Sequence, residues 1–211
     1  MQAREVVLRC AAAILACLTT MAASPALAAP RDDADWPCQQ RLMPTLGAGS
    51  LWTGPPLDSA GDWTAEPRVA GLVAQIAPRN VSAENGVAAI SAFAESLTPQ
   101  DKRRLLTLAF SGLLAETNQE RSDLIARLKD LGHRQHELAD IASHASEELR
   151  GLPAAGAAGD DAAKRADLEQ RVAFVTQAFE NTQRTMRYAC EAPVRLEARL
   201  GRYAQAIQSR L

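Results

Sequence analysis

The sequence predicts an all-α protein organised around a long antiparallel helical hairpin, a two-helix coiled coil. Apolar residues recur at alternating steps of three and four in two long stretches, which is the spacing of a coiled-coil interface. A glycine- and alanine-rich turn at 151–159 separates the stretches, and no segment shows the period of two that a strand requires. We therefore expect a first arm at 98–150 and a second arm at 160–211.

The recurring positions, called here the apolar stripe, belong to both arms. Folding the chain at about Ala155 pairs them in a single register, for example Leu138 with Val172 and Leu131 with Phe179. In the first arm the stripe consists of Leu124, Leu128, Leu131, Gln135, Leu138, Ala142, Ala145 and Leu149. In the second arm it consists of Leu168, Val172, Val175, Phe179, Thr182, Met186, Ala189, Leu196, Leu200, Tyr203 and Ile207.

Residues 1–28 have the organisation of a cleaved export signal. Arg4 and Arg9 precede an apolar run at 10–23, and small residues follow at a cleavage site that ends at Ala28. The run is shorter than the roughly 20 residues that a membrane span needs, and we expect no span in the mature chain. The sequence predicts a periplasmic protein; a lipid anchor through Cys17 is the alternative.

The charges of the mature chain are mixed along its length. Removal of the signal changes the net charge from −2 to about −3, and no basic face argues for nucleic acid or anionic lipid. We expect the partner to be another periplasmic or envelope protein.

Cys38 and Cys190 are the cysteines that remain after processing. Exported proteins usually pair such residues, and we expect a Cys38–Cys190 disulfide that holds the N-terminal segment across the hairpin.

Residues 29–65 form a tryptophan- and proline-rich segment without helical or strand period. It contains Trp36, Trp52 and Trp63, whereas disordered chains are poor in aromatic residues. We predict an ordered, extended segment packed at the base of the hairpin, with indole N–H groups bonded to polar partners. The alternative is that the three tryptophans form a partner-binding patch.

Two short helices are predicted next, at 66–77 and 82–97, with Ser82 as the N-cap of the second. The domain thus runs from 66 to 211, and these helices cover the broad apolar face that the first arm has at 105–114.

Thr98 and Pro99 start the first arm, threonine as N-cap and proline at the first helical position. In the second arm we expect Pro193 to bend the helix without ending it, because the apolar stripe resumes in phase.

Motifs for catalysis, haem, nucleotide or zinc binding are absent from the sequence, and we expect no enzymatic activity and no cofactor. One helix face is less ordinary. The spacing of four residues brings their side chains together on one side of the first arm: His133, His136, Asp140 and His144. These side chains could bind zinc or copper weakly. A solvated polar face is the alternative.

The residues Leu97, Thr98, Pro99 and Gln100 resemble the L-T-x-x-Q signature of periplasmic envelope-stress proteins, a group of helical chaperones and metal-responsive relatives. Here the glutamine stands one place early, and Asp101 occupies its position. The hairpin is also similar to that of efflux-pump adaptors, although their β-rich flanking halves have no counterpart in the sequence.

The function expected from the sequence is that of an exported, non-enzymatic adaptor that docks to another protein through its base or its projecting coiled coil. The alternative is a periplasmic chaperone or metal-responsive binder of the envelope-stress type.

Overall fold

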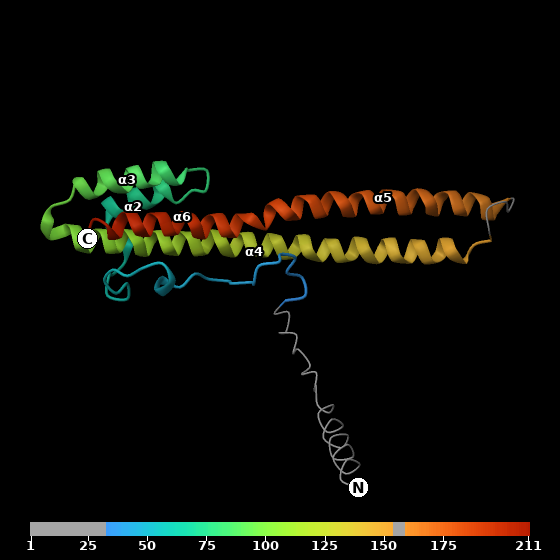
Figure 1. Ribbon diagram of the computed structural model, residues 1–211, viewed down its shortest axis with the longest axis horizontal. Coiled ribbons are helices and arrows are strands. Elements are labelled where there is room, and N and C mark those ends of the chain that lie inside the picture. The colour runs from blue at the N-terminus through green and yellow to red at the C-terminus, as the bar shows by residue number, and fades with distance from the viewer. Residues whose placement is uncertain (1–32, 154–158) are drawn as a thin grey trace, which may run out of the picture. The chain divides into compact units, whose positions relative to one another are not determined.

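A computed structural model describes residues 33–153 and 159–211, and these residues are helical with connecting segments and no strand (Figure 1). The expected export signal and the centre of the glycine-rich turn lie outside the described residues. No helix in the described ranges is both long and apolar enough to cross a membrane. The elements are η1 (Ala48–Ser50), η2 (Trp63–Ala65), α2 (Pro67–Ile76), α3 (Ala83–Glu95), α4 (Pro99–Gly151), α5 (Asp160–Ala189) and α6 (Glu191–Gln208).

The starts of α3 and α4 follow the predicted capping chemistry. The Ser82 hydroxyl accepts a hydrogen bond from the Asn85 amide at 3.1 Å, and the Thr98 hydroxyl accepts one from the Asp101 amide at 3.3 Å. Each bond satisfies a backbone N–H that the first helical turn leaves free.

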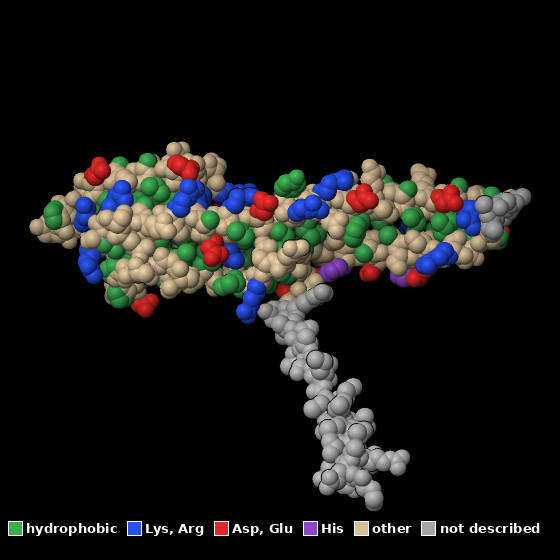
Figure 2. Space-filling view, viewed as in Figure 1, with side chains coloured by type: hydrophobic (Ala, Val, Ile, Leu, Met, Phe, Trp, Pro, Cys, Tyr) green, Lys and Arg blue, Asp and Glu red, His purple; other side chains and the backbone are tan. Residues whose placement is uncertain are grey.

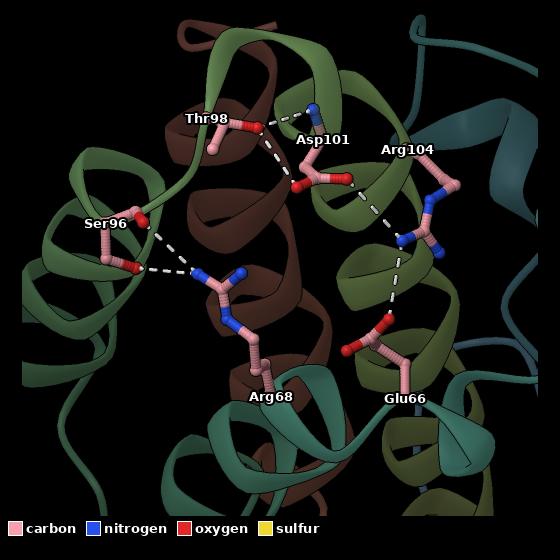
Figure 3. A network of polar contacts seen from close by, with 6 residues as sticks. All are labelled: Glu66, Arg68, Ser96, Thr98, Asp101 and Arg104. Atoms are coloured by element: carbon pink, nitrogen blue, oxygen red, sulfur yellow. Dashed lines mark hydrogen bonds and ion pairs between the residues drawn. The ribbon is translucent and has the colours of Figure 1, made fainter.

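A polar network surrounds the start of α4 (Figure 3). Arg104 contacts Asp101 at 3.8 Å and Glu66, at the start of α2, at 3.4 Å. Arg68 donates to the Ser96 carbonyl at the end of α3 at 3.2 Å. The network therefore links the ends of three helices at the solvent-exposed side of the base.

The hydrophobic core lies where α2, α3 and α6 pack with the first part of α4. Phe110 and Tyr203 are fully buried there. Arg199 of α6 is also buried, and its guanidinium donates to the carbonyls of Ala77 and Pro78 at 2.6 and 2.8 Å. These bonds satisfy carbonyls at and just beyond the C-terminal end of α2, and the Glu120 carboxylate pairs with the guanidinium at 3.6 Å, so the core tolerates the charge.

The long helix α4 packs along both α5 and α6 (Figure 1). Every predicted stripe position in these helices is buried or half-buried, whereas most residues between them are exposed. Leu128, Ala145, Leu168, Val175 and Met186 are the fully covered stripe residues outside the base. The three–four stepping in the sequence therefore identified the covered side of each helix.

Pro193 does more than bend the second arm, contrary to the expectation. Helix α5 ends at Ala189 and α6 begins at Glu191; Cys190 between them keeps right-handed helical torsions, and its amide donates to the Met186 carbonyl at 2.9 Å. Pro193 lies in the first turn of α6, where its missing N–H removes no intrahelical bond. The second arm is thus two helices whose stripes remain in phase.

Candidate functional site

The N-terminal segment, residues 33–46, lies along α4 and is held by side-chain contacts. Lys129 forms an ion pair with Asp33, and its hydrogen bond lowers the pKa of that carboxyl. Further along, Asn118 bonds both the amide and the carbonyl of Leu46, at 2.7 and 3.1 Å. The segment is therefore ordered without secondary structure of its own.

Arg121 joins the N-terminal segment to the second arm. The residue is only 6% exposed, and its guanidinium donates to the carbonyls of Met43 at 2.8 Å and Pro193 at 3.1 Å. Burial lowers the pKa of Arg121. Two carbonyls from different parts of the chain satisfy the hydrogen bonds of this buried cation. The arrangement requires α6 and the N-terminal segment to lie at fixed positions beside α4.

Gly132 provides the close approach between the N-terminal segment and α4. A Cβ atom at this position would overlap the carbonyl oxygen of Asp35. The same arrangement occurs at Gly112, where a Cβ would lie 2.8 Å from the Trp63 ring. Gly132 therefore makes room for the N-terminal segment and Gly112 for Trp63 of η2, roles that helix propensity alone does not reveal.

We predict that Gly132→Ala destabilises the protein although alanine is the better helix former. The gain in helix propensity is about 1 kcal/mol, whereas overpacking against backbone costs about 1–3 kcal/mol. Gly71→Ala is the matched control, because no atom lies within 4 Å of its Cβ position, and it should stabilise by about 1 kcal/mol. Urea unfolding of both variants tests this; stabilisation by Gly132→Ala would mean that the segment does not lie on α4.

The expected disulfide between Cys38 and Cys190 is present, with Cα atoms 5.6 Å apart. It connects the N-terminal segment to the residue that separates α5 from α6. The Gln40 side-chain amide donates to the Cys190 carbonyl, and the Trp36 indole N–H donates to the Gln40 carbonyl at 2.8 Å. Covalent and polar contacts therefore hold the segment at one place.

A groove of about 1050 Å³ opens beside the disulfide. The N-terminal segment forms one wall, α4 another, and the α5–α6 junction the third. Its lining residues are Pro37, Cys38, Gln39, Gln40, Gln135, His136, Ala139, Phe179, Gln183, Met186, Arg187, Cys190, Glu191, Val194 and Arg195.

The chemistry of the groove combines an apolar surface with amides and a cation. Phe179, Met186 and Val194 supply apolar surface, and Val194 is 54% exposed. Glu191 and Arg195 pair with each other at 2.7 Å, whereas Arg187 has no ion-pair or hydrogen-bond partner in the described part of the chain. The groove thus combines a mainly apolar surface with several amide and charged side chains, a composition that suits a binding surface.

Gln135 is a polar residue in the apolar stripe and borders the groove. Its Nε2 donates to the Phe179 carbonyl at 3.4 Å, but its Oε1 is buried without a hydrogen-bond partner among the described residues. An unpaired buried acceptor costs about 1–3 kcal/mol.

Gln135→Leu is therefore expected to stabilise the protein by about 1 kcal/mol, because it removes the unpaired oxygen and adds apolar surface to the interface. Gln177→Leu, at an exposed position of α5, should leave the stability unchanged. Thermal unfolding of the two variants is the measurement, and a lower midpoint for Gln135→Leu would contradict the assigned environment.

The predicted metal ligands do not come together. His133 lies 3.5 Å from Asp35 and 3.4 Å from Glu137, and His136 lies 3.7 Å from Asp35. In the described ranges, no group of three or more His, Cys, Asp or Glu side chains is arranged to hold a metal ion. Asp140 and His144 are exposed one and two turns further along α4. The histidines nearest the groove thus face the N-terminal segment.

The three tryptophans have different environments. Trp52 is 8% exposed, stacks on Phe110 with centroids 4.3 Å apart, and donates its indole N–H to the Pro55 carbonyl at 2.7 Å. Trp36 and Trp63 are half-buried, and Trp63 packs against the core. The rings are spread along α4, so they do not make a single patch.

Sequence reasoning did not find the groove, because its walls come from three separate stretches of the chain. Arg121, which continues the three–four stepping before Leu124, indicated a buried polar contact at the α4–α6 junction but not the groove. Nothing in the sequence marked Gln39, Gln40 and Gln183 as neighbours.

Comparison with known proteins adds no assignment. No protein-family model matches the chain, and no curated protein or solved structure matches it significantly.

Proposed function

We propose that this protein is an exported, non-enzymatic helical adaptor that docks to another periplasmic or envelope protein. The observation that carries the proposal is the apolar surface left uncovered away from the base. Ile141, Phe174, Tyr188 and Val194 are large exposed hydrophobic residues in the later part of α4, in α5 and at the start of α6. Such surface is typical of interaction sites when it gathers in patches.

The docking surface in this proposal is a coiled-coil arm made of α4 beyond Arg121 and α5. The continuous covered stripe supports this geometry. The bond between Gln135 and Phe179 supports the expected register, because helical side chains lean toward the N-terminus and the Gln135 amide lies near the level of Leu131. An arm with so narrow an apolar interface gains little stability from its own packing, which suits a surface used for contact with a partner.

A periplasmic chaperone is the second candidate, and the groove favours it. A client-binding chaperone needs a hollowed apolar surface, and the groove beside the disulfide has one. The metal-responsive form of this alternative has less support, since the histidine face offers no converging set of ligands in the described residues.

Photo-crosslinking in cells tests the adaptor against the chaperone. A photoreactive amino acid is placed at Phe174 or Tyr188 on α5, at Met43 on the N-terminal segment, or at Leu211 at the chain end, all of which are exposed. An adaptor should give one discrete heteromeric product from a subset of positions. Products of many sizes would favour the chaperone, and the absence of any product at all positions would contradict docking.

A further inference from the structure

We propose that the groove beside the Cys38–Cys190 disulfide binds a short apolar peptide segment that carries a carboxylate. The inference rests on the proposed function and identifies the part of the partner that this surface recognises.

The apolar lining selects for apolar side chains. Phe179 and Met186 belong to the apolar stripe and also line the groove. Val194 adds exposed apolar surface on the α6 side. Burial of a leucine or valine side chain here removes apolar surface of both partners from water, which contributes about 25 cal/mol per Å². Methionine adapts to side chains of different shape.

The glutamines make the groove suited to a peptide. Four of them line it, and Gln39 and Gln183 have no hydrogen-bond partner in the described part of the chain. A side-chain amide offers two donors and an acceptor, so it can bond both the N–H and the C=O of a peptide backbone. A ligand that buries these amides must pair them, or binding loses free energy. An extended peptide supplies donors and acceptors in alternation, whereas an alkyl chain supplies neither.

A positive charge in the groove indicates that the bound segment carries a carboxylate. Glu191 and Arg195 neutralise each other, which leaves Arg187 as the charged side chain of the lining without a partner in residues 33–153 and 159–211. His136 lies across the groove on α4. An acidic residue of the bound segment would pair with Arg187. The guanidinium can bond a carboxylate through two N–H groups, which also fixes the direction of the peptide.

The volume agrees with a short segment. At about 1050 Å³ the groove lies at the upper end of the range of ligand pockets, and its open side lets a chain enter and leave. It therefore suits a few consecutive residues of a partner.

Fluorescence anisotropy with the full oxidised protein tests the proposal. The probes are a short labelled peptide rich in leucine and valine with one glutamate, the same peptide with glutamine in place of glutamate, and labelled laurate. We expect the glutamate peptide to bind more tightly than the glutamine peptide, and laurate to bind weakly.

Two groove variants have matched controls on the same two helices. Arg187→Glu should weaken the glutamate peptide by about fivefold, the size of a partly exposed ion pair, with little effect on the glutamine peptide. Val194→Asp should weaken both peptides by about tenfold because it places a charge on the apolar wall. Arg171→Glu on α5 and Ala198→Asp on α6, both exposed and outside the lining, should leave peptide binding unchanged.

Equal binding of laurate and peptides, or equal effects of groove and control variants, would overturn the proposal. Strong laurate binding that Val194→Asp abolishes would assign the groove to an anionic amphiphile instead. The photo-crosslinking experiment separates this result from the fate of the proposed function. If a discrete cross-linked partner persists in Val194→Asp and Arg187→Glu, the peptide-binding role of the groove is wrong while the adaptor function stands. If peptide binding depends on the groove but no partner is cross-linked, the adaptor function is wrong while the peptide-binding role stands.

Discussion

Removal of the Cys38–Cys190 disulfide is expected to lower the free energy of unfolding by up to about 5 kcal/mol. The bond joins residues 152 positions apart, and the entropy that a cross-link removes from the unfolded chain grows with the loop that it closes. The N-terminal segment would then be held only by non-covalent contacts, among them those of Lys129, Arg121 and Asn118.

The double variant Cys38→Ser with Cys190→Ser is compared with the oxidised protein by urea unfolding, and with the wild type under reducing conditions as the control. The double variant and the reduced wild type should unfold at the same lower midpoint. If both unfold within about 0.5 kcal/mol of the oxidised protein, the disulfide does not restrict the unfolded chain as proposed.

Trp52→Ala is expected to cost about 3–5 kcal/mol of stability, because the indole is buried against Phe110 and its loss leaves a large cavity. The irregular chain between η1 and η2 would lose the contact of this ring with the core. Trp36→Ala, at a half-buried position next to the disulfide, is the control and should cost clearly less.

Thermal unfolding of the two tryptophan variants provides the measurement. If Trp52→Ala lowers the unfolding midpoint only slightly and partner cross-linking is lost, Trp52 would be a partner-binding residue. A large effect with cross-linking retained at reduced temperature would place it in the core.

Local chemistry made the helix starts predictable. Ser82 and Thr98 cap helices because a side-chain oxygen accepts from a free amide, and this depends on only a few neighbouring residues. The apolar stripe was equally legible, because a helix that is covered on one side repeats its apolar residues with a fixed period.

Features that depend on three-dimensional approach were not predictable. The role of Gly132 follows from the position of the Asp35 carbonyl, which lies nearly 100 residues earlier in the chain. The end of α5 at Ala189 was missed because Pro193 acts on the turn that precedes it, and the in-phase stripe concealed the break. The groove requires the disulfide, α4 and the α5–α6 junction to be placed together, and no local pattern encodes that.

Hydrogen–deuterium exchange of the full oxidised protein, with and without a saturating amount of the glutamate peptide, tests the docking groove most directly. We expect slower exchange in residues 38–40, which line the groove on an irregular segment, and around the α5–α6 junction at Cys190. Helices α2 and α3 should exchange as before. Protection confined to α2 and α3, or no protection at saturation, would contradict it.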